Sequence, residues 1–201
     1  MWDIQASKKT VDKTIGALSA NNISSILFDD PKTASDYVTS LIPKGSSVLT
    51  ETSITLKEMG LMSRIDESEE YESFRSKIFG ISDASQRLKE RRRMVNPDVV
   101  VGSAQAVTSS GHIYFASKSG SQLPPYAYSA SKAIIVIGTQ KIVGSDEDAM
   151  RRIKERCVPM ENERALKEYG HGTSLNKLFI ILKEEIAGRL IVVFINKSIG
   201  F

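Results

Sequence analysis

Residues 133–137 read Ala-Ile-Ile-Val-Ile, an uninterrupted apolar run bounded by Lys132 and Gly138. A run of this length fits a β-strand and is short for a helix. A strand with one exposed face would alternate between apolar and polar residues, so this flat pattern predicts a strand that is covered on both faces. Such strands are typical of parallel sheets with other elements packed on each side.

Outward from this run, strand-like segments alternate with helix-like ones. The expected strands are 23–28, 46–50, 98–102, 105–108, 112–116, 133–137, 178–182 and 189–195, and the expected helices are 1–22, 31–42, 53–60, 82–94 and 145–158. Residues 64–79 are weakly patterned, which predicts a loop or a short helix. This alternation predicts an α/β fold, a three-layer sandwich with a mostly parallel sheet. Ser109-Ser110-Gly111 predicts an inserted β-hairpin that adds antiparallel strands to that sheet.

Length and composition favour one globular domain over 1–201, with the opening helix of 1–22 packed on it. The 201 residues include 41% hydrophobic and 25% charged residues, which excludes intrinsic disorder. A net charge of +3 argues against a nucleic-acid partner. Neither a signal peptide nor an apolar run of bilayer length is present, so we expect a cytoplasmic protein without a membrane partner.

Several classes of site are excluded by the residues that they require. A single cysteine rules out an internal disulfide and a Cys-ligated zinc or iron–sulfur site within one chain. His112 and His171 lack partners at metal-ligand spacing, so no metal is expected. The serine-hydrolase elbow and the His-Glu-x-x-His helix are missing, as are the Walker and dinucleotide fingerprints. We therefore expect no cofactor.

Ligands of open α/β sheets bind beyond the carboxyl ends of the strands, which selects the loops after 46–50, 98–102, 112–116 and 133–137. In the first loop, Thr52 and Ser53 precede a helix and would suit an anionic group, although plain helix capping is an equal alternative. Glu51 is the candidate catalytic residue, as a nucleophile, a general base or a hydrogen-bond partner of a sugar hydroxyl. A surface carboxylate is its alternative.

The other three loops supply glycines, hydroxyl groups and a cation. Gly102 and Ser103 follow a buried strand, where glycine permits close approach by a ligand or marks a simple bend. Gly120, Ser121 and Gln122 lie in a small polar turn that resembles a phosphate-binding nest or forms a flexible turn. Lys141 follows the 133–137 strand and could reach a bound anion, although lysines at strand ends are common without a function. The convergence of four strand ends supports a ligand site.

Taken in chain order, several stretches of this sequence resemble the LUD-domain family, which is named for lactate utilisation. The matching stretches are 45–61, 96–143, 146–170 and 188–201, and the most specific are 106–108 with Gly111, 119–122 and 140–143. The resemblance implies a fold of the sugar-phosphate isomerase and CoA-transferase type. Many relatives carry Asn-Arg where this chain has Ser121-Gln122, which removes an arginine contact to an anion. The glutamate motif of CoA-transferases is missing, so Glu51 inherits no role from them.

Some members of that family accompany iron–sulfur subunits that oxidise lactate to pyruvate. The resemblance therefore implies a cluster-free subunit of a 2-hydroxy acid utilisation system that binds a small anionic metabolite. A free-standing enzyme acting on a phosphorylated or CoA-type substrate is one alternative, and a non-catalytic binding module is another. Whether the chain is an enzyme stays open, because Glu51 lacks a second acid–base residue in the sequence pattern. We also expect a homo-dimer, the commonest assembly of soluble oligomers.

Overall fold

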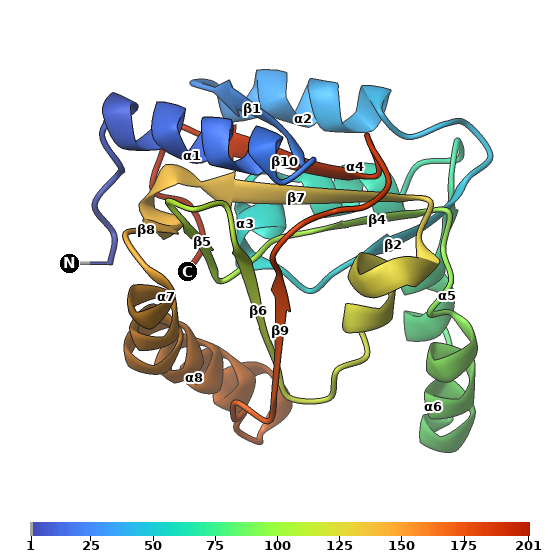
Figure 1. The fold of residues 1–201 in the computed structure, drawn as a ribbon. Helices are drawn as coiled ribbons and strands as arrows, with labels where there is room; N and C mark the ends of the chain where they lie inside the picture. Colours follow the sequence, from blue (N-terminus) through green and yellow to red (C-terminus); the bar gives the residue numbers. More distant parts are fainter. Residues whose placement is uncertain (1) are drawn as a thin grey trace.

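The computed structural model describes residues 2–201 and contains a six-stranded, wholly parallel sheet (Figure 1). In spatial order its strands are β1 (Ser24–Phe28), β10 (Leu190–Ile195), β7 (Lys132–Gly138), β4 (Val99–Gly102), β2 (Ser47–Thr50) and β3 (Glu72–Ser73). The apolar run 133–137 lies in β7, inside the sheet, and all of it is buried. The α/β class with a mostly parallel sheet is therefore confirmed.

Three helices cover one face of this sheet: α2 (Pro31–Ser40), α3 (Ile54–Glu58) and α4 (Leu61–Asp66). The start of α2 follows from its sequence, because Asp30 accepts a hydrogen bond from the Thr33 amide and Pro31 occupies the first turn. Ala34 and Val38 then fall on the buried side of α2. This layer fixes the position of α3, whose N-terminus follows the carboxyl end of β2.

The opposite face is covered by α1 (Lys8–Ala20) and by a second sheet. In spatial order its strands are β8 (Ile142–Val143), β5 (Ala106–Thr108), β6 (Ile113–Ser117) and β9 (Lys177–Ile181). The hairpin at 109–111 is present, but the prediction that it extends the parallel sheet is wrong. Because β2 and β7 already pair with both edges of β4, the chain after Gly102 must leave the plane of that sheet.

A nearly continuous helical stretch packs on the outer face of the second sheet, formed by α7 (Asp146–Arg152), a π-helical turn η3 (Ile153–Cys157) and α8 (Val158–Tyr169). The sequence predicts an end near 158, whereas the stretch continues to Tyr169. Pro159 is tolerated because it lies in the first turn of α8, after the hydrogen-bond pattern has already changed in η3. Gly170, with φ of 71°, ends the helix in the left-handed conformation.

Shorter elements complete the fold: α5 (Phe74–Phe79), α6 (Ala84–Arg93), a π-helical turn η1 (Pro125–Ser129) and a 3-10 turn η2 (Thr139–Lys141). The expectation of short helix within 64–79 is met by α4 and α5. In Figure 1, α6 extends away from both sheets, and all of its residues are exposed or half-buried. Within residues 2–201, no helix is both long and apolar enough to cross a membrane.

Candidate functional site

Three of the loops singled out in the sequence meet at the carboxyl edge of the parallel sheet. Because β2, β4 and β7 are adjacent, the residues that follow them are neighbours in space. The Glu51 amide donates to the Val101 carbonyl at 3.0 Å, which holds the first loop against β4. The second loop begins at Gly102 and Ser103, and the third is η2, which ends at Lys141.

The Glu51 carboxyl group lies inside the protein, against Gly102 and Tyr126. A Cβ atom at Gly102 would lie 2.2 Å from Glu51 Oε2 and 2.1 Å from the Tyr126 hydroxyl, so only glycine leaves room for both groups. Among residues 2–201, neither Glu51 Oε1 nor the Tyr126 hydroxyl has a well-formed hydrogen bond. The alternative of a surface carboxylate is therefore wrong. The chain after β4 and the η1 turn bury the group in a way that the local sequence does not encode.

Burial dominates the protonation of Glu51. It raises the pKa of the carboxyl group from 4.5 to about 8, and the Tyr126 hydroxyl and the Ser103 amide offset this only in part. The group is therefore mostly protonated at pH 7. A carboxyl group in this state can donate a proton or, once ionised, accept one near physiological pH.

Tyr126 is a site residue that the sequence analysis missed, and an internal ion pair holds it in place. Its ring stacks on Phe115 with 4.6 Å between centroids. Arg189 Nη2 donates to the Tyr126 carbonyl at 2.7 Å and to Glu184 Oε2 at 2.6 Å, and Arg189 Nη1 donates to the carbonyls of Pro125 and Ala130. The one available signal was a tyrosine after two prolines, which did not indicate that its hydroxyl would meet Glu51.

Lys141 is buried, and only 1% of its surface is exposed. Its Nζ donates to Thr55 Oγ1 at 2.9 Å and to Ser103 Oγ at 3.1 Å. Burial and, to a smaller extent, the nearby charge of Arg152 lower the pKa of Lys141 from 10.5 to about 7. The lysine therefore links the loop after β4 to the N-terminal turn of α3.

Two other residues of the first loop have local partners. Ser53 caps α3, since its hydroxyl accepts a hydrogen bond from the Leu56 amide at 3.4 Å. Thr52 Oγ1 accepts a hydrogen bond from Arg75 at 2.8 Å. Ser53 thus takes the capping role that the sequence left open, and Thr52 faces α5.

The turn at 117–122 is a hydrogen-bonded unit beside α6. The Gly120 amide donates to Ser117 Oγ at 2.8 Å, and Ser117 Oγ donates to Gln122 Oε1 at 3.0 Å. Ser121 Oγ accepts a hydrogen bond from Arg91 at 2.8 Å. No hydrogen bond in the described chain joins these residues to Glu51, Ser103 or Lys141, so this turn is not part of the buried cluster.

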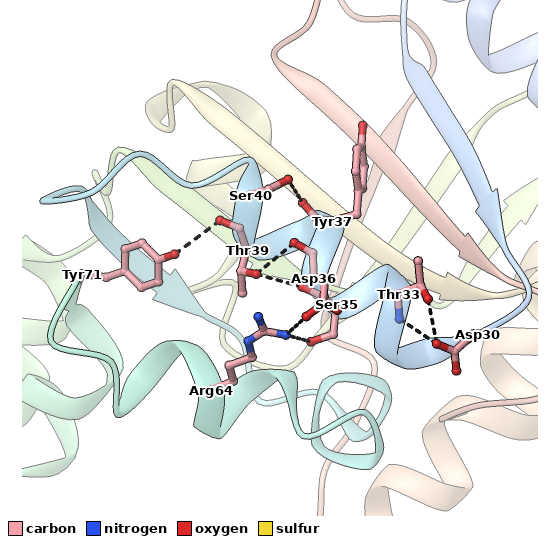
Figure 2. Close-up of polar contacts among 9 residues, drawn as sticks. All are labelled: Asp30, Thr33, Ser35, Asp36, Tyr37, Thr39, Ser40, Arg64 and Tyr71. Carbon is pink, nitrogen blue, oxygen red and sulfur yellow. Dashed lines mark hydrogen bonds and ion pairs between the residues drawn. The ribbon is translucent and has the colours of Figure 1, made fainter.

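A separate hollow of about 520 Å³ lies between α2 and the segment that leads to β3. It is lined by Asp36, Thr39, Ser40, Ile42, Lys44, Arg64, Ser68, Glu70 and Tyr71. Its charged groups are paired, with Arg64 Nη1 2.6 Å from Asp36 Oδ1 and Lys44 Nζ 2.5 Å from Glu70 Oε1. Figure 2 shows Arg64 reaching α2 from α4, and Tyr71 donating to the Thr39 carbonyl. The buried cluster differs, because it contains polar groups without such partners among residues 2–201.

Metal binding has no support in the described part of the chain, which holds no group of three or more histidine, cysteine, aspartate or glutamate side chains placed to ligate an ion. The chemistry available at the carboxyl edge is instead hydrogen bonding, proton transfer and charge. These functions come from one carboxyl group, one phenol and the buried cations.

Comparisons with known proteins identify a family model and several similar solved structures. The family model of the LUD domain, which describes the sequences of its members, matches residues 11–177 of this chain. A crystal structure of a DUF162 family protein from Deinococcus radiodurans aligns over 96% of this chain and 99% of its own, with a TM-score of 0.54 and 10% identity. The structures of eIF2B beta and eIF2B delta from Chaetomium thermophilum cover 59% and 71% of this chain and 44% and 55% of theirs. Both have TM-scores of 0.39, at 15% and 12% identity. A comparison with curated proteins finds no match.

Proposed function

This chain belongs to the LUD-domain family, and on that premise we propose that it is a subunit of a 2-hydroxy acid utilisation system and binds a small anionic metabolite at the carboxyl edge of its parallel sheet. The metabolite class is a short carboxylate that carries a hydroxyl group, of which lactate is the simplest candidate. Its location follows from the rule that open α/β sheets bind ligands where their strands end.

The observation that carries this proposal is the pairing of two buried, unsatisfied groups. Glu51 Oε1 and the Tyr126 hydroxyl lie close together but make no hydrogen bond of good geometry within residues 2–201, and leaving such a group unsatisfied costs about 1–3 kcal/mol. A ligand hydroxyl, which both donates and accepts a hydrogen bond, would satisfy the two groups together. A Glu51 pKa of about 8 suits this group to exchange a proton with that hydroxyl.

Oxidation of a 2-hydroxy acid also needs an electron acceptor. A single cysteine cannot supply the thiolate ligands of a Cys-ligated iron–sulfur cluster, so in this proposal the clusters belong to partner chains. The role of this chain is to bind and orient the metabolite, with the ionised fraction of Glu51 as the proton acceptor for its hydroxyl.

Calorimetric titration with lactate tests the binding step. The Tyr126→Phe variant removes one hydroxyl group and should weaken lactate binding by about 2- to 10-fold, the effect of losing a neutral hydrogen bond. Tyr128→Phe is the matched control, because Tyr128 is 84% exposed two residues away, and its affinity should equal that of the wild type. Absence of lactate binding, or equal affinity in Tyr126→Phe, would overturn the assignment of the hydroxyl site.

Anaerobic purification from the native cell tests the assignment as a subunit. The chain should co-purify with proteins that contain iron and acid-labile sulfide. A chain that purifies alone and free of iron, under conditions that preserve complexes, would reject that part of the proposal.

A further inference from the structure

Arg152 is a buried cation with one half of its guanidinium group unused. It is the last residue of α7, and its surface is 0% exposed. Its Nη1 donates to the Gln105 carbonyl and lies 3.0 Å from Cys157 Sγ. Within the described chain, its Nε and Nη2 are buried and lack hydrogen-bond partners. We refer to these two groups as the open edge of Arg152.

The open edge has the geometry of a carboxylate receptor. Nε and Nη2 carry parallel N–H bonds on one side of the planar guanidinium group, and this pair of donors binds both oxygens of a carboxylate at once. Two unpaired donors on different sides of the guanidinium group would indicate no particular ligand. Here the two unpaired donors lie side by side, so the expected ligand is a planar anion with two oxygen atoms.

A carboxylate of the protein does not fill this edge among residues 2–201. The charge of Asp3 acts on Arg152, but the Asp3 carboxylate pairs with Arg156 Nη2 at 2.8 Å. Burial lowers the pKa of Arg152, and the neighbouring Cys157 and Asp3 offset this only in part. A guanidinium group without a buried counter-ion is costly, which favours occupation by an anion from outside.

A second buried cation lies against the same segment of chain. Arg152 bonds to the carbonyl of Gln105, and Lys141 bonds to the hydroxyl of Ser103, two residues earlier. The Ser103 amide also contacts the Glu51 carboxyl group. Residues 103–105 therefore contact Arg152 through its Nη1, Lys141 and Glu51, which places the three groups around one short segment of chain.

We infer that the open edge of Arg152 binds the carboxylate group of the metabolite, with Lys141 as the second cation of this subsite. The inference rests on the proposed function and adds the residue that recognises the anionic group. In this arrangement the carboxylate pairs with Arg152, and the hydroxyl-bearing end of the same molecule meets Glu51 and Tyr126.

Acetate and acetamide separate this inference from the proposed function. Both probes are planar and of similar size, but only acetate is charged, and neither carries a hydroxyl group for Glu51. The wild type should bind acetate at least tenfold more tightly than acetamide, because hydrogen bonds to an ionised group are the stronger ones. Arg152→Lys keeps the charge and removes the fork, and it should weaken acetate binding about tenfold. Arg151→Lys is the control, since Arg151 is exposed, and it should bind acetate as the wild type does.

The wild-type protein supplies a second measurement that needs no variant. Acetate should move the ¹⁵N resonance of Arg152 Nε in a saturable way, and acetamide should not. Equal affinities for acetate and acetamide, or an unmoved Nε resonance in saturating acetate, would overturn the inference. Phosphate binding that depends on Arg152 without acetate binding would do so too. Acetate could bind as expected while the wild type and Tyr126→Phe bind lactate with equal affinity. In that case the anion subsite at Arg152 stands, and the assignment of a 2-hydroxy acid as the metabolite fails.

Discussion

Replacement of Glu51 by glutamine should remove a pH-dependent loss of stability that the wild-type protein carries. Between pH 4.5 and 8 the folded protein holds a proton on Glu51 that the unfolded chain releases. The stability contributed by this proton is fully present below pH 4.5 and is lost as the pH rises to about 8. Glutamine does not titrate, so the Glu51→Gln variant lacks this dependence.

The size of the effect follows from the pKa. One pKa unit corresponds to about 1.4 kcal/mol, so a rise from 4.5 to about 8 amounts to roughly 4–5 kcal/mol at a pH above both values. The free energy of unfolding of Glu51→Gln, relative to the wild type, should therefore increase by about 1.4 kcal/mol per pH unit from pH 5 to 7.5. Comparing the two proteins cancels the titration of all other groups.

Urea denaturation at pH 5, 6, 7 and 8 measures this difference directly. Glu185→Gln is the matched control, because this carboxylate is exposed, and its stability should run parallel to that of the wild type. A difference between wild type and Glu51→Gln that stays constant to within about 0.5 kcal/mol across this range would refute the reasoning. Glu51 would then titrate as a solvated carboxylate.

Three further substitutions test the groups around Glu51. Between pH 7 and 10 the unfolded wild type keeps a proton on Lys141 that the folded wild type has released, so the stability of the wild type rises with pH. Lys141→Met lacks this group, and its free energy of unfolding should fall relative to the wild type by about 1.4 kcal/mol per pH unit over that range. Urea denaturation at these pH values measures the difference. Arg189→Met should lower the free energy of unfolding by about 3–5 kcal/mol by leaving Glu184 buried and unpaired, and a double replacement of both residues by methionine should recover part of the loss in thermal denaturation. Gly102→Ala should cost about 1–3 kcal/mol because its Cβ meets a carboxyl and a hydroxyl group, whereas Gly16→Ala in α1 meets open space and should be neutral or stabilising when both are compared by thermal denaturation.

The strand β7 was predictable from the sequence because the pattern that indicates it lies within the strand itself. The apolar run 133–137 needs neighbours on both faces whatever the rest of the chain does, and the carboxyl end of such a strand is the usual place for a ligand. The structure brings Glu51, Ser103 and Lys141 together at this edge, and ligand binding by these residues stays a prediction. The hairpin at 109–111 was equally visible, but its sheet was not, because that depends on whether β4 has a free edge.

The properties that give the cluster its chemistry were not predictable in the same way. Glu51 is buried by Gly102 and by a tyrosine from a distant turn, and the position of that turn depends on Arg189 near the end of the chain. Arg152 lies in a helix that is rich in charged residues, where the sequence favours a solvated cation. Its burial follows from the path of the chain between β4 and β5, which supplies the Gln105 carbonyl.

The charges of the buried groups explain why the cluster suits an anion. Protonation neutralises Glu51 at pH 7, and burial leaves Lys141 near the midpoint of its titration, while arginine keeps its charge under these conditions. The cluster is therefore positive at pH 7, and the desolvation of its charges and its unpaired donors both lower the stability of the fold. A carboxylate at Arg152 would relieve these costs and raise the pKa of Lys141, so that ligand binding and proton uptake are coupled. Proton transfer from a ligand hydroxyl would then fall to the ionised fraction of Glu51, which separates anion recognition at Arg152 from proton transfer at Glu51.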